Sequence, residues 1–218
     1  MFTTAYITYF QELEQNNNRA WFNENKKRYE TAVKKPFQNF VQQLIDAMQM
    51  TDPDILIAPK DAIFRINRDI RFSKDKTPYK TQMSAAISKN GKKGNTTPGL
   101  YIAIGANEVF MGCGAMSMSK DQLQAVRQHI AHHLSDFQAI IEDETFKQTF
   151  GEITGEKNKR LPSEFVEAAE QQPLLYNKQF LASTTWEAER ILAPDFVAQT
   201  VACYEQMRPF GLFLGEAL

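Results

Sequence analysis

Apolar residues in the first fifty positions recur every three or four residues, which is the spacing of one face of a helix. One run predicts a first helix, and three asparagines suited to turns and caps end it: Tyr6, Tyr9, Phe10 and Leu13, then Asn16, Asn17 and Asn18. A second helix is expected from about Arg19. Pro36 marks either a kink in it or the first turn of a third helix, whose apolar stripe is Phe37, Phe40, Val41, Leu44, Ile45 and Met48.

The hydrophobic period shortens towards two after the turn at Asp52-Pro53-Asp54, and this alternation is typical of half-buried strands. Four segments fit strands: residues 63–67, 81–88, 100–105 and 108–114. Gly105-Ala106-Asn107 fits a tight reversal between the last two. Because strands joined by short loops pair antiparallel, the middle of the chain predicts an antiparallel sheet.

Helical patterns return after the predicted sheet. Ser119 with Gln122 forms a capping box, and the apolar run behind it predicts one helix as far as Ile141. A short helix over 144–150 follows, residues 151–185 are irregular, and helices run from Pro194 to the end with a break at Pro209. We therefore expect an α+β fold in one domain, residues 1–218, in which N- and C-terminal helices flank a central antiparallel sheet of four or more strands.

Composition narrows the class of protein. The chain has 43% hydrophobic and 23% charged residues, which is typical of a globular protein. No apolar run approaches the roughly 20 residues that a membrane helix needs, so we expect no membrane partner. Glu12 and Glu14 stand where a signal peptide would be apolar. Cys113 and Cys203 lack the spacing of a metal motif or a disulfide framework, and we expect reduced thiols in a cytoplasmic protein.

The charges are unevenly distributed along the chain. Residues 60–93 contain ten basic and three acidic side chains, a net charge of +7, although the whole chain carries only −1. The remainder therefore carries −8. A basic segment on an acidic body predicts an anion-binding surface, because a local positive field attracts anions whatever the total charge.

The strongest candidate site lies within this basic segment. Guanidinium groups bind phosphate or carboxylate through two parallel hydrogen bonds, and converging lysines favour a multiply charged anion. The candidate ligand-binding residues are Arg65, Arg68, Asp69, Arg71, Ser73, Lys74, Lys76, Tyr79 and Lys80. Within this set, Asp69 could orient Arg68 or Arg71, and Tyr79 could donate a proton.

Three interpretations of these residues remain open. The best guess is a site for a phosphorylated or carboxylated small molecule, and whether it is catalytic stays undecided. The alternative is a nucleic-acid or protein-interaction module that uses the same basic surface without catalysis. In the third, the arginines pair with the protein's own acids. A concave cluster of arginines would favour the first, and a flat or convex spread that includes Lys89, Lys92 and Lys93 would favour the second.

Other chemical signals are weaker. His129 and His133 lie one helical turn apart but lack further close ligands, so we expect a structural role, no metal site and no cofactor. Trp21, Tyr79 and Tyr101 could stack bases beside the basic segment, although isolated aromatic residues more often belong to a core.

Several motifs resemble one protein family. The longest is Arg65-Ile66-Asn67-Arg68-Asp69-Ile70-Arg71-Phe72-Ser73 followed by Lys74-Asp75-Lys76-Thr77-Pro78-Tyr79-Lys80-Thr81. The others span nearly the whole chain: Leu13 to Phe22, Tyr29, Pro36, Gly112-Cys113-Gly114, Leu123 with Arg127, Arg160 with Pro162, and Pro173 with Leu175 and Lys178. Together they resemble the uncharacterised family named domain of unknown function 2461 (DUF2461), with Asn158 departing from its pattern. The resemblance implies a single-domain, cytoplasmic protein and transfers no activity or catalytic residue.

Overall fold

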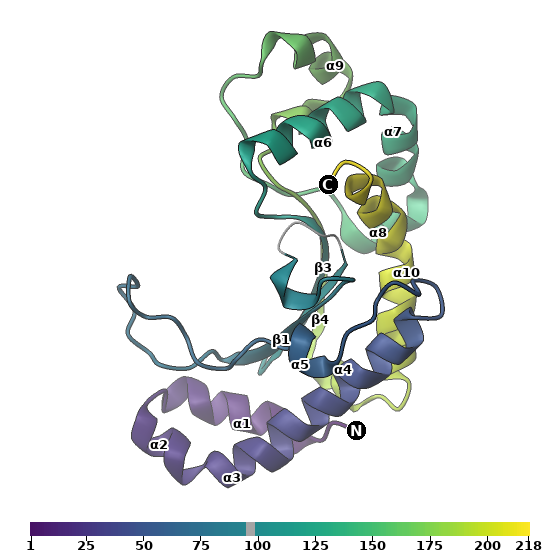
Figure 1. The fold of residues 1–218 in the computed structure, drawn as a ribbon. Coiled ribbons are helices and arrows are strands. Elements are labelled where there is room, and N and C mark those ends of the chain that lie inside the picture. The colour runs from purple at the N-terminus through teal and green to yellow at the C-terminus, as the bar shows by residue number, and fades with distance from the viewer. Residues whose placement is uncertain (95–98) are drawn as a thin grey trace.

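The strands form an antiparallel sheet in the middle of the molecule (Figure 1). The computed structural model describes residues 1–94 and 99–218. The strands are β1 (Gln82–Ile87), β2 (Leu100–Gly105), β3 (Glu108–Ala115) and β4 (Phe180–Glu187), in the spatial order β1-β2-β3-β4. Each neighbouring pair is antiparallel. Helices precede β1 and follow β4 along the chain. The antiparallel sheet and these flanking helices confirm the expected α+β class.

The N-terminal helices form a single bent unit at one end of the sheet. They are α1 (Thr4–Gln15), α2 (Arg19–Glu24), α3 (Lys26–Arg28), a π-helical segment (Tyr29–Lys34) and α4 (Lys35–Met48), and the short α5 (Pro59–Ala62) follows. Asn18 caps α2 by accepting a hydrogen bond from the Trp21 amide at 3.0 Å. Pro36 lies in the first turn of α4, directly after the π-helical segment, and the backbone before it is already helical at Lys34 and Lys35. The proline, which has no N–H, therefore lies within a continuous helical run.

The C-terminal half supplies the helices at the opposite end and one long helix. They are α6 (Lys120–His132), α7 (Leu134–Glu142), α8 (Glu144–Phe150), α9 (Val166–Gln171) and α10 (Phe196–Gly215). The capping box of α6 is confirmed, since Ser119 and Gln122 exchange hydrogen bonds of 3.0 and 3.2 Å. None of the helices within the described residues has both the length and the apolar character of a bilayer span.

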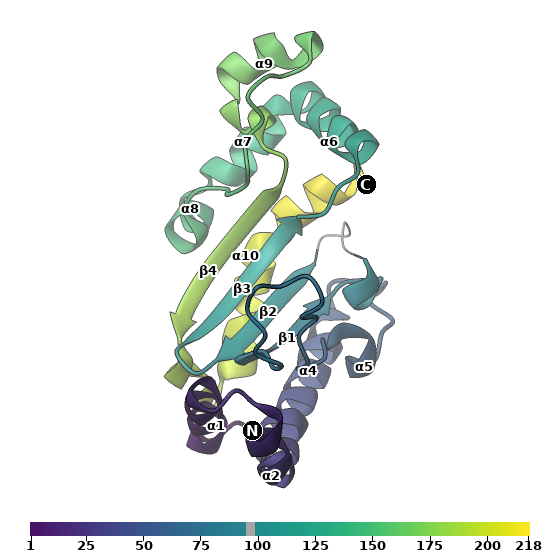
Figure 2. The same cartoon turned by 90° about the vertical axis from the view of Figure 1, so that its left-hand side faces the viewer.

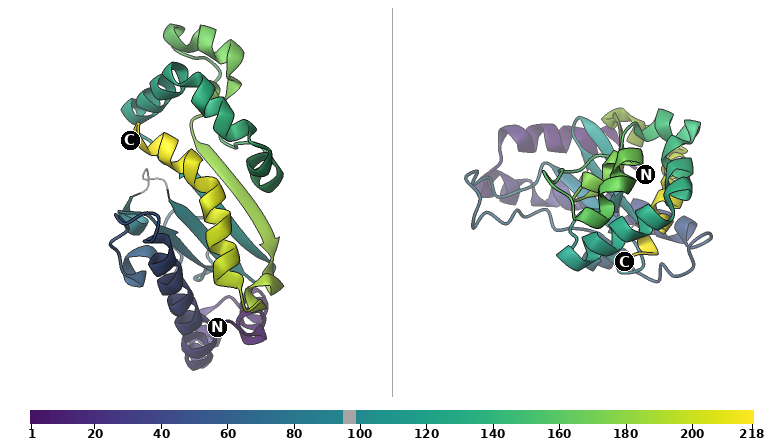
Figure 3. Two further views of the ribbon diagram at one scale, coloured as in Figure 1. Left: turned by 90° about the vertical axis from the view of Figure 1, so that its right-hand side faces the viewer. Right: turned by 90° about the horizontal axis from the view of Figure 1, so that it is seen from above.

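Helices cover one face of the sheet. Side chains alternate along a strand, so Ile102, Met111 and Ala182 point to the same side, and all three are fully buried. The helices α4 and α10 lie over this side (Figure 3, left) and belong to the same contiguous core as the strands. Burial of this face under two helices therefore fixes the register of every strand.

The other face of the sheet is more open. Ala86, Tyr101, Gly112 and Ser183 are successive cross-strand neighbours on it. In Figure 2, which looks onto this face, the segment after α5 crosses in front of the strands while α10 lies behind them. In Figure 1 the open face lies between α1 and α2 at one end and α6 and α9 at the other, which gives the molecule a concave outline.

The expected strand at residues 63–67 is wrong. This segment makes only isolated bridges, Ile63 with Ala85 and Asn67 with Tyr79, because the chain leaves the edge of β1 there. The fourth strand of the sheet is instead β4, which begins within the stretch 151–185, where the sequence shows no clear pattern, and ends two residues beyond it. Its central Ser183, Thr184 and Thr185 are polar on both faces of the strand, and this hides the alternation.

Two helix boundaries also differ from expectation. The single helix expected from Ser119 to Ile141 is interrupted at His133, whose φ of −118° and ψ of 44° are not helical. Apolar periodicity continues across this residue, so the pattern alone does not reveal the break. The break expected at Pro209 is absent, because α10 continues through that residue as far as Gly215.

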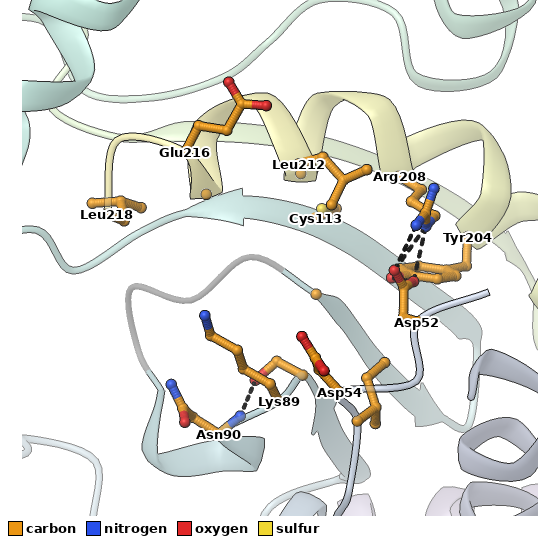
Figure 4. A pocket seen from close by; sticks show the side chains of 15 residues that line it. Asp52, Asp54, Lys89, Asn90, Cys113, Tyr204, Arg208, Leu212, Glu216 and Leu218 are labelled. Carbon is orange, nitrogen blue, oxygen red and sulfur yellow. Dashed lines mark hydrogen bonds and ion pairs between the residues drawn. The ribbon is translucent and has the colours of Figure 1, made fainter. Parts of the chain in front are cut away.

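An ion pair fixes the turn after α4 against α10. Arg208 holds the carboxylate of Asp52 with hydrogen bonds of 2.7 to 2.9 Å, and the Tyr204 hydroxyl donates to the same carboxylate at 2.7 Å (Figure 4). Burial acts to raise the pKa of Asp52, but the hydrogen bonds from Arg208 and Tyr204 outweigh it and leave the pKa below its usual value.

We predict that Asp52→Asn lowers the free energy of unfolding by about 2 kcal/mol at neutral pH, because it removes a charge that three donors hold. Since the folded-state pKa of Asp52 lies below the unfolded value, its contribution is complete above about pH 4 and is lost at lower pH. Denaturant titrations from pH 7 to pH 3 check this. The exposed neighbour Asp54→Asn is the matched control, and an unchanged acid profile in Asp52→Asn would contradict the prediction.

Candidate functional site

The candidate residues lie on an arm, residues 64–80, that projects from the open side of the sheet (Figure 1, blue-teal). Its root is joined to β1, because the Phe64 amide donates to the Ser84 carbonyl at 2.9 Å. Its two limbs are held together by backbone bonds from Arg68 to Pro78 at 2.9 Å and from Lys80 to Ile66 at 2.8 Å. The arm carries six basic and two acidic side chains, a net charge of +4.

Tyr79 anchors the arm to the N-terminal helices. Its ring is buried and stacks on Phe22, with a centroid separation of 3.9 Å and an interplanar angle of 14°. The side chain of Asn17 donates to the Tyr79 carbonyl at 2.9 Å and accepts from its amide at 3.1 Å. This arrangement gives Tyr79 a structural task, and the asparagine run after α1 supplies the partner.

Two of the three arginines are held by acids of the arm itself. Arg68 pairs with Asp75 and also donates to the Thr77 side chain. Arg71 pairs with Asp69 at 2.7 Å, and its guanidinium carbon lies 5.8 Å from the ring centre of Phe72. Both pairs are local, and they shape the tip of the arm.

Some of the remaining candidate side chains make hydrogen bonds within the arm, and others make none. Lys76 donates to the Ile70 carbonyl at 2.9 Å, which closes the tip, and Ser73 is half-buried. In the described part of the chain, Arg65, Lys74 and Lys80 have no side-chain hydrogen bond and no ion pair. Burial and the nearby Arg65 lower the pKa of Lys80. Two cations therefore lie near each other at the root of the arm without a carboxylate that neutralises them both.

Aromatic side chains continue from the root of the arm onto the open face of the sheet. The Lys80 ammonium lies 5.3 Å from the ring centre of Phe64, which lies 6.2 Å from that of Tyr101. Tyr101 lies in turn 6.1 Å from Phe110 on β3. All three rings are half-buried, and they border a pocket of about 390 Å³ on this face. The arm and the open face thus form one continuous surface.

A second pocket, of about 460 Å³, lies on the helix-covered side (Figure 4). It is lined by charges of both signs, among them Asp54, Lys89 and Glu216, while Arg208 is occupied by Asp52. Cys113 also borders it, but burial raises the pKa of this thiol to about 12, so it is not a thiolate near neutral pH. The two cysteines are free and buried.

Comparison with known proteins identifies the family. A family model described as a conserved hypothetical protein (DUF2461) matches residues 5–213. The chain belongs to the DUF2461 family. No curated protein gives a significant match to it. The description of DUF2461 names no reaction, ligand or partner, so the role of the site has to be inferred from its geometry.

The aromatic residues that the sequence suggests for base stacking lie in different places in this DUF2461 protein. Tyr101 was a candidate stacking residue and lies on the open face, whereas Trp21 packs on Tyr9 at 5.4 Å in the N-terminal unit. Phe64 and Phe110 are not among the candidate residues that the sequence indicates. The alternation along 108–114 could have revealed Phe110, because it places this ring on the face opposite the buried Val109 and Met111.

Asp75 determines the shape of the arm in this DUF2461 protein. Asp75 accepts hydrogen bonds from the Thr77 amide at 2.9 Å and from the Thr77 hydroxyl at 3.0 Å. These two bonds, together with the hydrogen bond from Arg68, lower the pKa of Asp75 to about 2. We predict that Asp75→Ala makes the amides of Arg68 and Lys80 exchange with deuterium several-fold faster, because their bonds join the two limbs. Asp69→Ala at the tip is the control and should leave both amides protected. Equal exchange in wild type and Asp75→Ala would show that other contacts hold the limbs together.

Proposed function

We propose that this protein binds nucleic acid, with the arm contacting the phosphate backbone. The observation that supports this most strongly is the projecting position of the arm together with the three cations Arg65, Lys74 and Lys80, which lack ion-pair partners in the described part of the chain. Cations already paired to carboxylates contribute little to anion binding, whereas unpaired ones release counterions when they meet phosphate.

The distribution of charge favours a long anion over a small one. The arm holds +4 and the rest of the chain −5, so the attraction is concentrated on an element that extends away from the body. The arm carries cations that are unpaired within the described residues both at its root, Arg65 and Lys80, and near its tip, Lys74, so they are spread over its length. A nucleic-acid backbone has a line of regularly spaced charges, and a small ligand does not.

A phosphorylated or carboxylated small molecule is the second candidate. A hollow of about 360 Å³ at the root of the arm favours it, and Arg68, Thr77 and Lys80 are among its lining residues. Arg68 is engaged with Asp75 and Thr77 there, so a small anion would have to replace those contacts. This exchange makes the second candidate weaker.

We predict that the triple variant Arg65→Gln, Lys74→Gln, Lys80→Gln binds single-stranded oligonucleotides at least tenfold more weakly than wild type at low salt. Each lost phosphate contact should reduce the slope of log affinity against log salt concentration by about 0.7. Fluorescence anisotropy with a labelled oligonucleotide at several salt concentrations measures both quantities.

The matched control removes three exposed lysines outside the arm, in Lys35→Gln, Lys147→Gln, Lys159→Gln. Its total charge equals that of the arm variant, so unequal affinities separate local contact from net charge. Equal slopes in the two variants, or no binding by the wild type at low salt, would refute the proposal. Stabilisation of the wild type by phosphate or citrate, without oligonucleotide binding, would support the small-molecule candidate instead.

A further inference from the structure

We propose that the open face of the sheet beside the arm stacks unpaired nucleobases, so that the bound nucleic acid is a single strand. This inference rests on the proposed function, because the arm has to hold the backbone while the bases reach the sheet. The arm alone would not distinguish a single strand from a duplex. Stacking on the sheet would make this distinction, and it names the residues that contact the bases.

The first support is the chain of aromatic rings. Phe64, Tyr101 and Phe110 follow one another with ring centres 6.2 and 6.1 Å apart, starting beneath the ammonium of Lys80. Phe64 belongs to the arm and the other two belong to neighbouring strands. When Lys80 or Arg65 binds a phosphate, the base of the same nucleotide would therefore be close enough to stack on one of these aromatic side chains. Half-buried aromatic side chains beside a basic element are the arrangement on which single strands stack.

The second support is the pocket next to these rings. Its volume is about 390 Å³, and Ala86, Gly112 and Gly114 contribute small residues to its lining. At Gly112 a side chain would meet Leu181 at 3.0 Å and Phe110 at 3.3 Å. Gly114 has a φ of 153° and lies so close to Phe180 that a Cβ would come within 1.9 Å of its carbonyl oxygen. The side chains of Leu181 and Phe110 therefore cover Gly112, and they give the pocket an apolar border against which a flat ring can pack.

Charges around the open face set where the backbone of the strand can run. Lys92 borders the pocket, and its ammonium donates to the carbonyls of Lys60 and Ile63 at 2.6 and 2.9 Å without a carboxylate partner in the described residues. Glu108 lies directly opposite Glu187 on β3 and β4, the two strands farther from the arm, at the end of the sheet where the arm enters β1 through Gln82. Two facing carboxylates repel phosphate, so the backbone of the strand should stay on the β1 side of the sheet, between the arm and Lys92.

Base pairing would prevent this contact. In a duplex the faces of the bases are stacked on one another and are unavailable to protein rings, whereas a single strand can turn its bases onto the sheet. The arm alone would attract single and double strands by charge. The rings would then add affinity for the single strand only.

The experiment compares four labelled ligands of equal length on the wild-type chain: single-stranded DNA, single-stranded RNA, an abasic strand with the same phosphates, and a duplex. We expect both single strands to bind at least a hundredfold more tightly than the abasic strand and the duplex, since each stacked base contributes about one order of magnitude and at least two bases meet a ring. DNA and RNA differ in the 2′-hydroxyl, so tighter binding of RNA would show that the protein contacts this group.

Variants locate the effect. Tyr101→Leu, Phe110→Leu keeps apolar volume on the sheet and should weaken binding of the single strands about a hundredfold, or about tenfold for each ring. Its binding to the abasic strand and its salt dependence should stay at wild-type values. Tyr176→Leu removes a half-buried ring elsewhere and serves as the matched control. Thermal melting verifies that each variant is folded.

A spectroscopic measurement on the wild type makes the test independent of variants. A single strand containing 2-aminopurine should change its fluorescence on binding, because stacking on an aromatic ring quenches this base. Equal affinity for abasic and ordinary strands, with no fluorescence change, would overturn the stacking inference and leave the arm as a backbone contact. Absence of binding to all four ligands at low salt would overturn the proposed function as well.

Discussion

The burial of one face of the sheet under α4 and α10 is the constraint on which the rest of the molecule depends. Side chains alternate along each strand, so covering one face commits every second residue to the core and leaves its neighbours on the other face. Ile102 and Met111 are committed in this way, and Tyr101 and Phe110 follow as residues of the open face. The aromatic surface is thus a direct consequence of how the core is built.

The arm depends on the same constraint through its root. Ile66 and Tyr79 are buried, and Tyr79 stacks on Phe22 of the N-terminal unit, so the two limbs leave the body from fixed positions. Beyond them the acids of the arm hold Arg68 and Arg71, and these pairs shape the tip. Arg65 and Lys80 remain at the root, beside Phe64. Within one segment, Arg68 and Arg71 therefore hold the arm in shape, while Arg65 and Lys80 are available to attract an anion.

Much of the fold was predictable from sequence because its signals are local. The stripe from Phe37 to Met48, the cap at Ser119 and the reversal after Gly105 each depend on a few neighbouring residues. The strand β4 was missed because its partner β3 lies about seventy residues earlier, and Ser183 to Thr185 carry no local apolar alternation. For the site, the sequence located the basic segment but not the state of its arginines. Whether Arg68 meets Asp75 or a ligand is determined by the path of the arm, which short-range patterns do not encode.

In the binding mode that we propose, a nucleic-acid strand lies across the arm and the open face. Photo-crosslinking tests it most directly: a single strand with 5-iodouracil at successive positions is irradiated with the wild-type protein, and the modified peptides are identified by mass spectrometry. We expect crosslinks at Phe64, Tyr101 and Phe110, in an order that follows the position of the label along the strand. Crosslinks confined to α4, α10 or the helix-side pocket would contradict it.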